Sequence, residues 1–129
     1  MTTQELIEAI RTWGTDRNII GANAKATTQT QFVKLLEEVE ELNVAIAIPD
    51  HAETIDAIGD CTVVLILLAN LAGVKFEDCL QSAYDEIKGR TGHMSADGVF
   101  VKDAPSDDDF DEPLPERACT DSEVCESCQ

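Results

Sequence analysis

The chain has 129 residues, which is enough for one domain with a hydrophobic core and too few for two. It is strongly acidic, with a formal net charge of −17, and residues 104–129 alone carry nine acidic side chains and one basic side chain. Direct binding to nucleic acid needs a basic surface, so this composition argues against that class of protein.

The amino terminus has no basic segment followed by an apolar run, and so it does not resemble a secretory signal. The longest apolar run, 63–69, is far shorter than the roughly 20 residues that cross a bilayer. Cys61 and Cys79 fall in apolar helical patterns, where small buried thiols are common. We therefore expect a soluble cytoplasmic protein without membrane contact.

A first helix is predicted from a cap at Thr2 or Thr3 to about Trp13, where Gly14 would end it. A second helix is predicted from Thr27 or Thr28 to just before Pro49, which cannot continue a helix. The expected inner face of the first helix comprises Leu6, Ile7 and Ile10, and that of the second comprises Phe32, Leu35, Leu36, Val39, Leu42 and Ile46.

A third helix is predicted from a cap at Asp50 to Gly73. Its first half is polar, whereas residues 63–69 are apolar all round. A segment of that kind is buried on every side, either in the centre of a bundle or at a subunit interface.

A fourth helix is predicted over 76–88, with Leu80, Ala83, Tyr84 and Ile87 facing inward. Residues 92–103 are expected to form an ordered loop with a short extended piece at Val99-Phe-Val. From Ala104 onward the composition predicts a disordered acidic tail. The expected architecture is an all-α, four-helix domain over 1–103 followed by the tail over 104–129.

Carboxylates are concentrated on the two central helices. The second helix carries Glu37, Glu38, Glu40 and Glu41, and like charges at such spacings repel. Either bulk water or a bound cation must offset this repulsion. The third helix would run antiparallel and bring Asp56 and Asp60 to face them, and Mg²⁺ prefers oxygen ligands of this kind. The sequence therefore allows two readings, a solvated acidic face or a metal site.

A longer series of motifs favours the metal site. Glu37-Glu38-x-x-Glu41, followed by Asp56-Ala-Ile-Gly-Asp60 and an apolar helix, resembles the MazG-like all-α nucleoside triphosphate pyrophosphohydrolases, most of all their short phage forms. The likeness extends over about residues 11–103. It also includes Trp13-x-x-x-Arg17, Gln31-x-x-Lys34, Lys88-x-Arg90-x-Gly92 and Asp97-Gly-Val-Phe-Val-Lys102.

The resemblance implies a dimer or tetramer in the cytoplasm, or in the host cytoplasm if a phage encodes it. It further implies Mg²⁺-dependent cleavage of a nucleoside triphosphate to the monophosphate and pyrophosphate, with Mn²⁺ as an alternative metal. Carried over by position, Glu38, Glu41 and Asp60 match the metal ligands of the family. Glu37 lies beside them and could orient or deprotonate the attacking water, so Glu37 and Glu38 are the catalytic candidates.

The family's second motif is ExxD, and this chain departs from it. The place three residues before Asp60 is Ala57. We predict that Asp56 substitutes there as the fourth ligand. Glu53-Thr-Ile-Asp56 matches ExxD literally but lies one turn further from the apolar helix.

Four residues are candidates for substrate binding. Trp13, the only tryptophan, would stack on the base by the resemblance, or would be a core residue. Lys34 would meet phosphate, or would form an i,i+4 ion pair with Glu38. Lys88 and Arg90, with Lys102, form the only basic concentration and would contact phosphate or a partner subunit.

Two other functions remain open at this point. The first is a non-catalytic, acidic helical protein that binds a partner through its tail. The second is a module that holds a nucleotide or metal without hydrolysing it. Deletion of residues 104–129 would abolish the first function and spare an enzyme.

Overall fold

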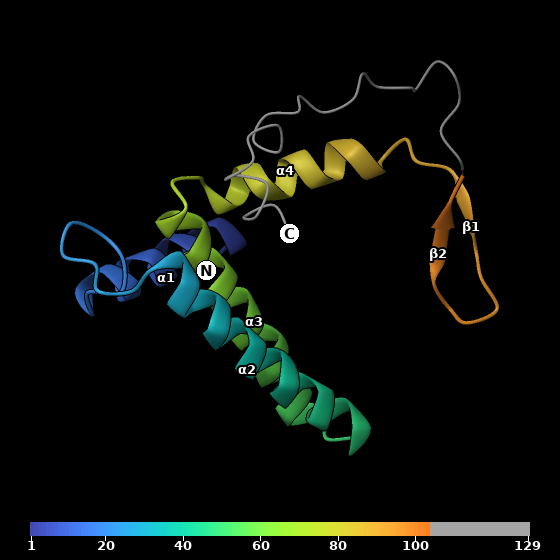
Figure 1. Cartoon of the computed structure of the whole chain (residues 1–129), viewed down its shortest axis with the longest axis horizontal. Helices are drawn as coiled ribbons and strands as arrows, with labels where there is room; N and C mark the ends of the chain where they lie inside the picture. Colours follow the sequence, from blue (N-terminus) through green and yellow to red (C-terminus); the bar gives the residue numbers. More distant parts are fainter. Residues whose placement is uncertain (104–129) are drawn as a thin grey trace, which may run out of the picture. The chain divides into compact units, whose positions relative to one another are not determined.

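A computed structural model describes residues 1–103, and the predicted acidic tail lies outside the described residues. The chain divides into two compact units, Met1–Ile87 and the part that begins at Lys88. The first unit is helical, which confirms the predicted all-α class. Its helices are α1 (Thr3–Asp16), α2 (Thr28–Ala47), α3 (His51–Leu71) and α4 (Phe76–Ile87) (Figure 1).

The starts of the first three helices are fixed by polar caps, as the sequence predicts. The Thr2 hydroxyl accepts the Glu5 N–H at 3.1 Å, and the Glu5 carboxylate accepts the Thr2 N–H at 2.7 Å. Thr27 and Thr30 form the same reciprocal pair at the start of α2. The Asp50 carboxylate accepts a backbone N–H in the first turn of α3. These bonds satisfy amide donors that have no partner within the helix.

The prediction that Gly14 ends the first helix is wrong. Helix α1 continues to Asp16, and Gly14 is buried inside it. A Cβ atom at this position would lie 2.6 Å from Cδ2 of Leu67, a side chain of α3. Gly14 therefore permits the close approach of α1 to α3, and it does not act as a helix terminator.

Helices α2 and α3 form a long antiparallel pair (Figure 1). Of the described helices, only α3 packs against α2, and it covers the side that carries Glu38 and Ala45. The remaining side of the predicted apolar face is therefore uncovered within the described chain, contrary to the sequence prediction. Its exposed members are Phe32, Leu36, Val39 and Ile46.

The apolar half of α3 is buried, but not on every side. Val64, Ile66, Leu67 and Ala69 are buried, whereas Leu65 is 39% exposed. By length and composition alone, α3 is long and apolar enough to cross a membrane, and 28% of its most apolar stretch is buried. The same helix carries Asp56 and Asp60, and carboxylates are costly in lipid.

Helix α4 is amphipathic, yet it contains no buried residue. The predicted inward positions are exposed, including Leu80 at 53% and Ile87 at 52%, and Cys79 is exposed as well. The prediction of a buried inner face is wrong for the described chain because α4 packs only against α3, beyond an ion pair between Glu77 and Arg11 of α1. The apolar face of α4 is therefore largely uncovered within the described residues.

The second unit contains a β-hairpin of β1 (Gly92–Met94) and β2 (Phe100–Lys102). The strands are antiparallel, with His93 opposite Val101. Gly98 adopts φ +87° in the connecting turn, a conformation that favours glycine. The predicted extended piece at 99–101 thus overlaps β2, while its pairing with β1 was not predicted.

Candidate metal centre

Three carboxylates from α2 and α3 meet at one point. Glu38, Glu41 and Asp60 each place one carboxylate oxygen within 4.8 Å of the others. Glu38 and Glu41 are three residues apart on α2, which sets them about one turn from each other on the same side. Asp60 comes from the middle of α3, and the antiparallel packing brings it opposite them.

Glu38 differs from its neighbours because it is buried. It is 6% exposed, the only buried charged residue in the described part of the chain, whereas Glu41 and Asp60 are exposed. Its Oε2 atom is buried and has no hydrogen-bond partner. An unsatisfied polar atom in such a place costs free energy, and this cost is much larger for a charge. The fold therefore retains a carboxylate oxygen that a ligand from outside the chain could bind.

This donor set fits a divalent cation. Ligand atoms of one Mg²⁺ ion lie at most about 4 Å apart, because each oxygen is about 2.1 Å from the metal. The three oxygens here lie within 4.8 Å of one another, and the exposed side chains of Glu41 and Asp60 can rotate to adjust this spacing. Glu38 is held by burial and would provide the fixed ligand. An all-oxygen set with open positions is typical of Mg²⁺ and Mn²⁺ sites.

The cluster borders a cavity of about 470 Å³ between α1, α2 and α3. Glu38, Asp60 and Trp13 are among the residues that line it. This volume lies in the range of small-molecule sites. The remaining lining residues include Ile19, Thr30, Gln31, Lys34, Glu37, Val63, Val64 and Leu67.

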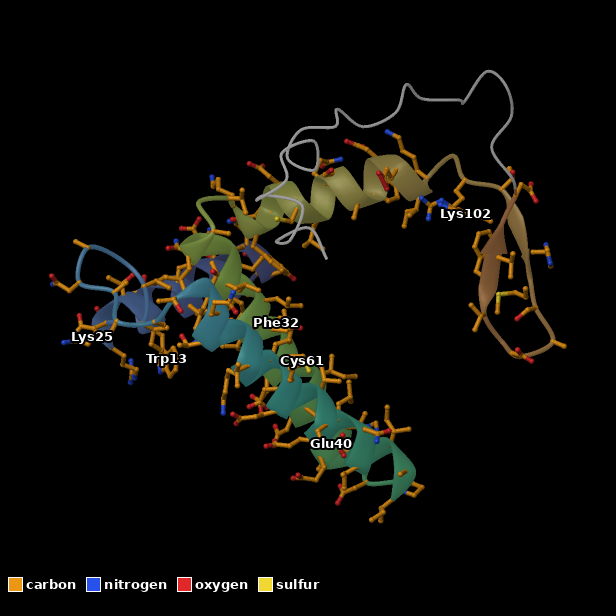
Figure 2. All side chains as sticks on the ribbon, viewed as in Figure 1. Trp13, Lys25, Phe32, Glu40, Cys61 and Lys102 are labelled. Carbon is orange, nitrogen blue, oxygen red and sulfur yellow. The ribbon has the colours of Figure 1, made fainter. Side chains whose placement is uncertain are left out.

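Trp13 projects from α1 beside the start of α2 and is 43% exposed (Figure 2). Its ring also borders a second, largely apolar cavity of about 410 Å³, which Leu6 and Ile10 help to line. The Arg17 guanidinium lies 4.5 Å from the ring centroid, and Arg17 donates to the Trp13 carbonyl at 3.2 Å. One face of the indole is therefore occupied by a cation, while its partial exposure does not fit a simple core residue.

Lys34 points to the carboxylates. Its Nζ atom lies 3.3 Å from Oε1 of Glu38 and 3.4 Å from Oε1 of Glu37. The bond to Glu38, followed by that to Glu37, raises the pKa of Lys34 above its ordinary value. The i,i+4 ion pair considered from the sequence is thus present, and Lys34 and Glu37 line the same cavity as Glu38.

The structure does not bring Asp56 into the carboxylate cluster. Glu38, Glu41 and Asp60 meet without it, and Asp56 is exposed. The adjacent position, Ala57, is 5% exposed and lies one turn before Cys61 on the buried side of α3. Neighbouring residues of a helix point about 100° apart, so the Asp56 carboxylate does not occupy the place that a carboxylate at position 57 would have.

Glu53 is placed elsewhere. It lines a separate cavity of about 390 Å³ near the α2–α3 turn, together with Glu41 and Asp50. Its backbone N–H is bound by the Asp50 cap. Within the described chain, neither alternative for a fourth ligand joins the three-carboxylate cluster.

The sequence predicts Cys61 only as a small buried thiol, and the structure places it close to the cluster. Burial raises the pKa of its thiol, and the charges of Glu38, Asp60 and Glu41 raise it further. Cys61 is on α3, next to Asp60 in the chain (Figure 2). The feature of the sequence that could have indicated this proximity is the position of Cys61 directly after Asp60.

Lys88 and Arg90 belong to the second unit, which is described by itself. Both residues take part in interactions within the structure. Lys102 lies in β2, opposite Gly92. Their predicted contact with phosphate or with a partner subunit stays a prediction.

Comparison with known proteins gives one family match. Residues 26–95, more than half of the chain, match the model of the MazG nucleotide pyrophosphohydrolase domain. An uncharacterized 18.2 kDa protein from the rep-hol intergenic region of Haemophilus phage HP1 is 42% identical over 66 residues. That alignment covers 51% of this chain and 39% of the phage protein, so the chain spans well under half of this relative.

A solved structure shares the fold. It is described as a Cyanophage S-2L MazG-like pyrophosphohydrolase bound to dGDP and three catalytic Mn²⁺ ions per active site. The two structures superpose with a TM-score of 0.58 and 23% sequence identity, over 82% of this chain and 97% of the other. The similarity establishes that the helical arrangement is of the same type.

Proposed function

This chain belongs to the MazG nucleotide pyrophosphohydrolase family, and on that premise we propose that it is a Mg²⁺-dependent enzyme that converts nucleoside triphosphates to monophosphates and pyrophosphate. Mn²⁺ would serve as an alternative metal. The observation that supports this most is the buried, unpartnered Oε2 atom of Glu38 beside Glu41 and Asp60. Metal and nucleotide in a cyanophage protein of the same fold support the same assignment.

Glu38, Glu41 and Asp60 would hold the cation. A bound divalent cation lowers the pKa of a coordinated water and offsets charge on the phosphate oxygens. Glu37 lines the same cavity and is 58% exposed at its side chain, so it can accept a proton from water or orient it. Since the chain is strongly acidic, a triphosphate needs cations between itself and these carboxylates.

Trp13 would contact the base of a nucleotide bound in this cavity. The indole is half-exposed and lines the same cavity as Glu38 and Asp60, so one nucleotide could reach both. Stacking on an aromatic ring tolerates different bases because every base has a π-face. Lys34 is the cation on α2 that can meet phosphate oxygens in this cavity.

The test is pyrophosphate release from a panel of deoxynucleoside and ribonucleoside triphosphates, with Mg²⁺, with Mn²⁺ and with EDTA. We expect metal-dependent release, with the matching monophosphate accumulating in equal amount. Asp78→Asn serves as a matched control for Glu38→Gln, because Asp78 is exposed and lies on α4, outside the cluster. The absence of release from every triphosphate, by a folded helical protein, would refute the proposal.

We also propose that the protein works as a dimer or tetramer in the cytoplasm. The apolar face of α4 is exposed at Leu80 and Ile87, and that of α2 is exposed at Phe32 and Leu36. Large exposed apolar patches often mark an interface. Sedimentation of wild-type protein and of Leu80→Asp should show an assembly that the variant weakens. A monomeric wild-type protein at micromolar concentration would contradict this proposal.

A further inference from the structure

The carboxylate cluster already contains a cation that belongs to the chain. The Lys34 ammonium lies 3.3 Å from Glu38 and 3.4 Å from Glu37, and it donates a hydrogen bond to Glu37. It reaches Oε1 of Glu38, whereas the buried Oε2 has no partner. Lys34 therefore pairs with one oxygen of the Glu38 carboxylate, and the other oxygen has no partner.

A divalent cation on Glu38 would oppose this ammonium. Both would sit on oxygens of one carboxylate, and two positive charges at such short separation repel, most strongly where burial lowers the local dielectric. The charge of a metal ion on Glu38 would also reduce the attraction that now holds Lys34. Glu38 is fixed by burial, with 8% of its side chain exposed, so the mobile partner is Lys34, whose side chain is 48% exposed.

A released Lys34 ammonium would stay within the cavity beside the carboxylate cluster. Lys34 lines the cavity that Glu38, Asp60 and Trp13 also line. In the described chain it is the only lysine or arginine among the residues that line this cavity. A phosphate group brought in with the metal would offer Lys34 a second anion in this cavity, besides Glu37, to which it already donates.

We propose that Lys34 is an exchangeable counter-ion, paired with Glu38 before metal binds and transferred to a substrate phosphate afterwards. Metal and triphosphate then bind cooperatively, because each favours the same position of one side chain. By linkage, the factor by which nucleotide strengthens metal binding equals the factor by which metal strengthens nucleotide binding. This inference rests on the proposed function, and it adds a positioning role that the family assignment does not contain.

The test measures Mn²⁺ binding by calorimetry, with and without a triphosphate analogue that is not hydrolysed. Without nucleotide, Lys34→Met should bind Mn²⁺ about two- to fivefold more tightly than wild type, because no ion pair has to be broken. With Mn²⁺ present, the same variant should bind the analogue more weakly. The cooperativity factor should fall towards one, whereas Lys34→Arg should retain most of it.

Two controls separate exchange from a change in overall charge. Lys75→Met removes the same charge from a lysine that does not line the cavity and should leave the Mn²⁺ affinity unchanged. The corresponding nucleoside, which lacks phosphates, should bind wild type and Lys34→Met equally. Weaker or unchanged Mn²⁺ binding by Lys34→Met, or full cooperativity in that variant, would overturn the proposal.

The outcome is distinct from a failure of the proposed function. Binding of Mn²⁺ and of the analogue is measured without turnover, so it tests the exchange even in a protein that releases no pyrophosphate. Conversely, full activity in an enzyme whose Lys34→Met variant keeps wild-type cooperativity would leave the function intact and refute the exchange.

Discussion

Two of the carboxylates that pair with cations in the helical unit, Glu77 and Glu38, have different surroundings. At the junction of α1 and α4, both oxygens of Glu77 are bound, by Arg11 at 2.9 Å and 2.6 Å and by Gln4 at 2.5 Å. Between α2 and α3, Glu38 is more deeply buried, but one oxygen has only Lys34 and the other has no partner. The better satisfied carboxylate holds helices together. The less satisfied one is available for a ligand.

The largest expected effect comes from removing the open carboxylate. Glu38→Gln should lower metal-dependent turnover by at least about 100-fold, because the fixed metal ligand is lost. Its metal-free unfolding free energy should change by no more than about 0.5 kcal/mol or should rise, because a buried charge is removed. Pyrophosphate release and urea unfolding measure the two effects. Full Mg²⁺-dependent turnover in Glu38→Gln would contradict the assigned metal site.

A second variant adds a carboxylate to the same buried surface. Ala57→Glu should lower the metal-free unfolding free energy by about 2–4 kcal/mol, because a charge enters a position that is 5% exposed. Mn²⁺ should restore part of this loss if the new carboxylate reaches the metal. Thermal unfolding with Mn²⁺ and with EDTA measures the difference, and Asp56→Glu is the exposed control. Equal destabilisation with and without Mn²⁺ would show that position 57 lies outside the metal site.

Two glycine substitutions test how closely α1 packs against α3. Gly14→Val should destabilise the protein by about 1–3 kcal/mol, since its Cβ would press on Leu67. Gly59→Ala, in the interior of α3 with nothing within 4 Å, should instead stabilise it by about 0.5–1 kcal/mol. Urea unfolding of both variants gives the comparison. A neutral Gly14→Val would mean that α1 does not approach α3 closely.

The smallest effect concerns the satisfied carboxylate. Hydrogen bonds from Arg11, then Gln4, hold the pKa of Glu77 far below its usual range. Because the folded-state pKa is depressed, the pair stabilises the protein above the unfolded pKa of about 4.3, and this stability is lost as the pH falls further. Glu77→Gln should be less stable at pH 7 and should lose less stability on acidification to pH 3. Thermal unfolding across this range would show parallel curves if Glu77 contributed nothing, while turnover at pH 7 should be unchanged.

The sequence by itself determined the helices and most of the site. Caps at Thr2, Thr27 and Asp50 and the break at Pro49 predicted where helices begin and end, because these are local effects of side chains on adjacent backbone groups. The spacing of Glu38 and Glu41 on one helix, with Asp60 before an apolar run, predicted three carboxylates that the structure brings together.

The tertiary structure decided which helix faces are buried and which side chains meet, because both depend on the neighbouring helix. Periodicity predicted apolar faces on α2 and α4, but it could not tell that α3 covers only part of one and little of the other. It could not show whether Gly14 ends α1 or lies at a helix contact, because the Leu67 side chain that it meets comes from a distant part of the chain. Nor could it show that Asp56 stays outside the cluster or that Lys34 pairs with a carboxylate that has one open oxygen. Those properties arise from the packing of α2 against α3, which local sequence patterns do not encode.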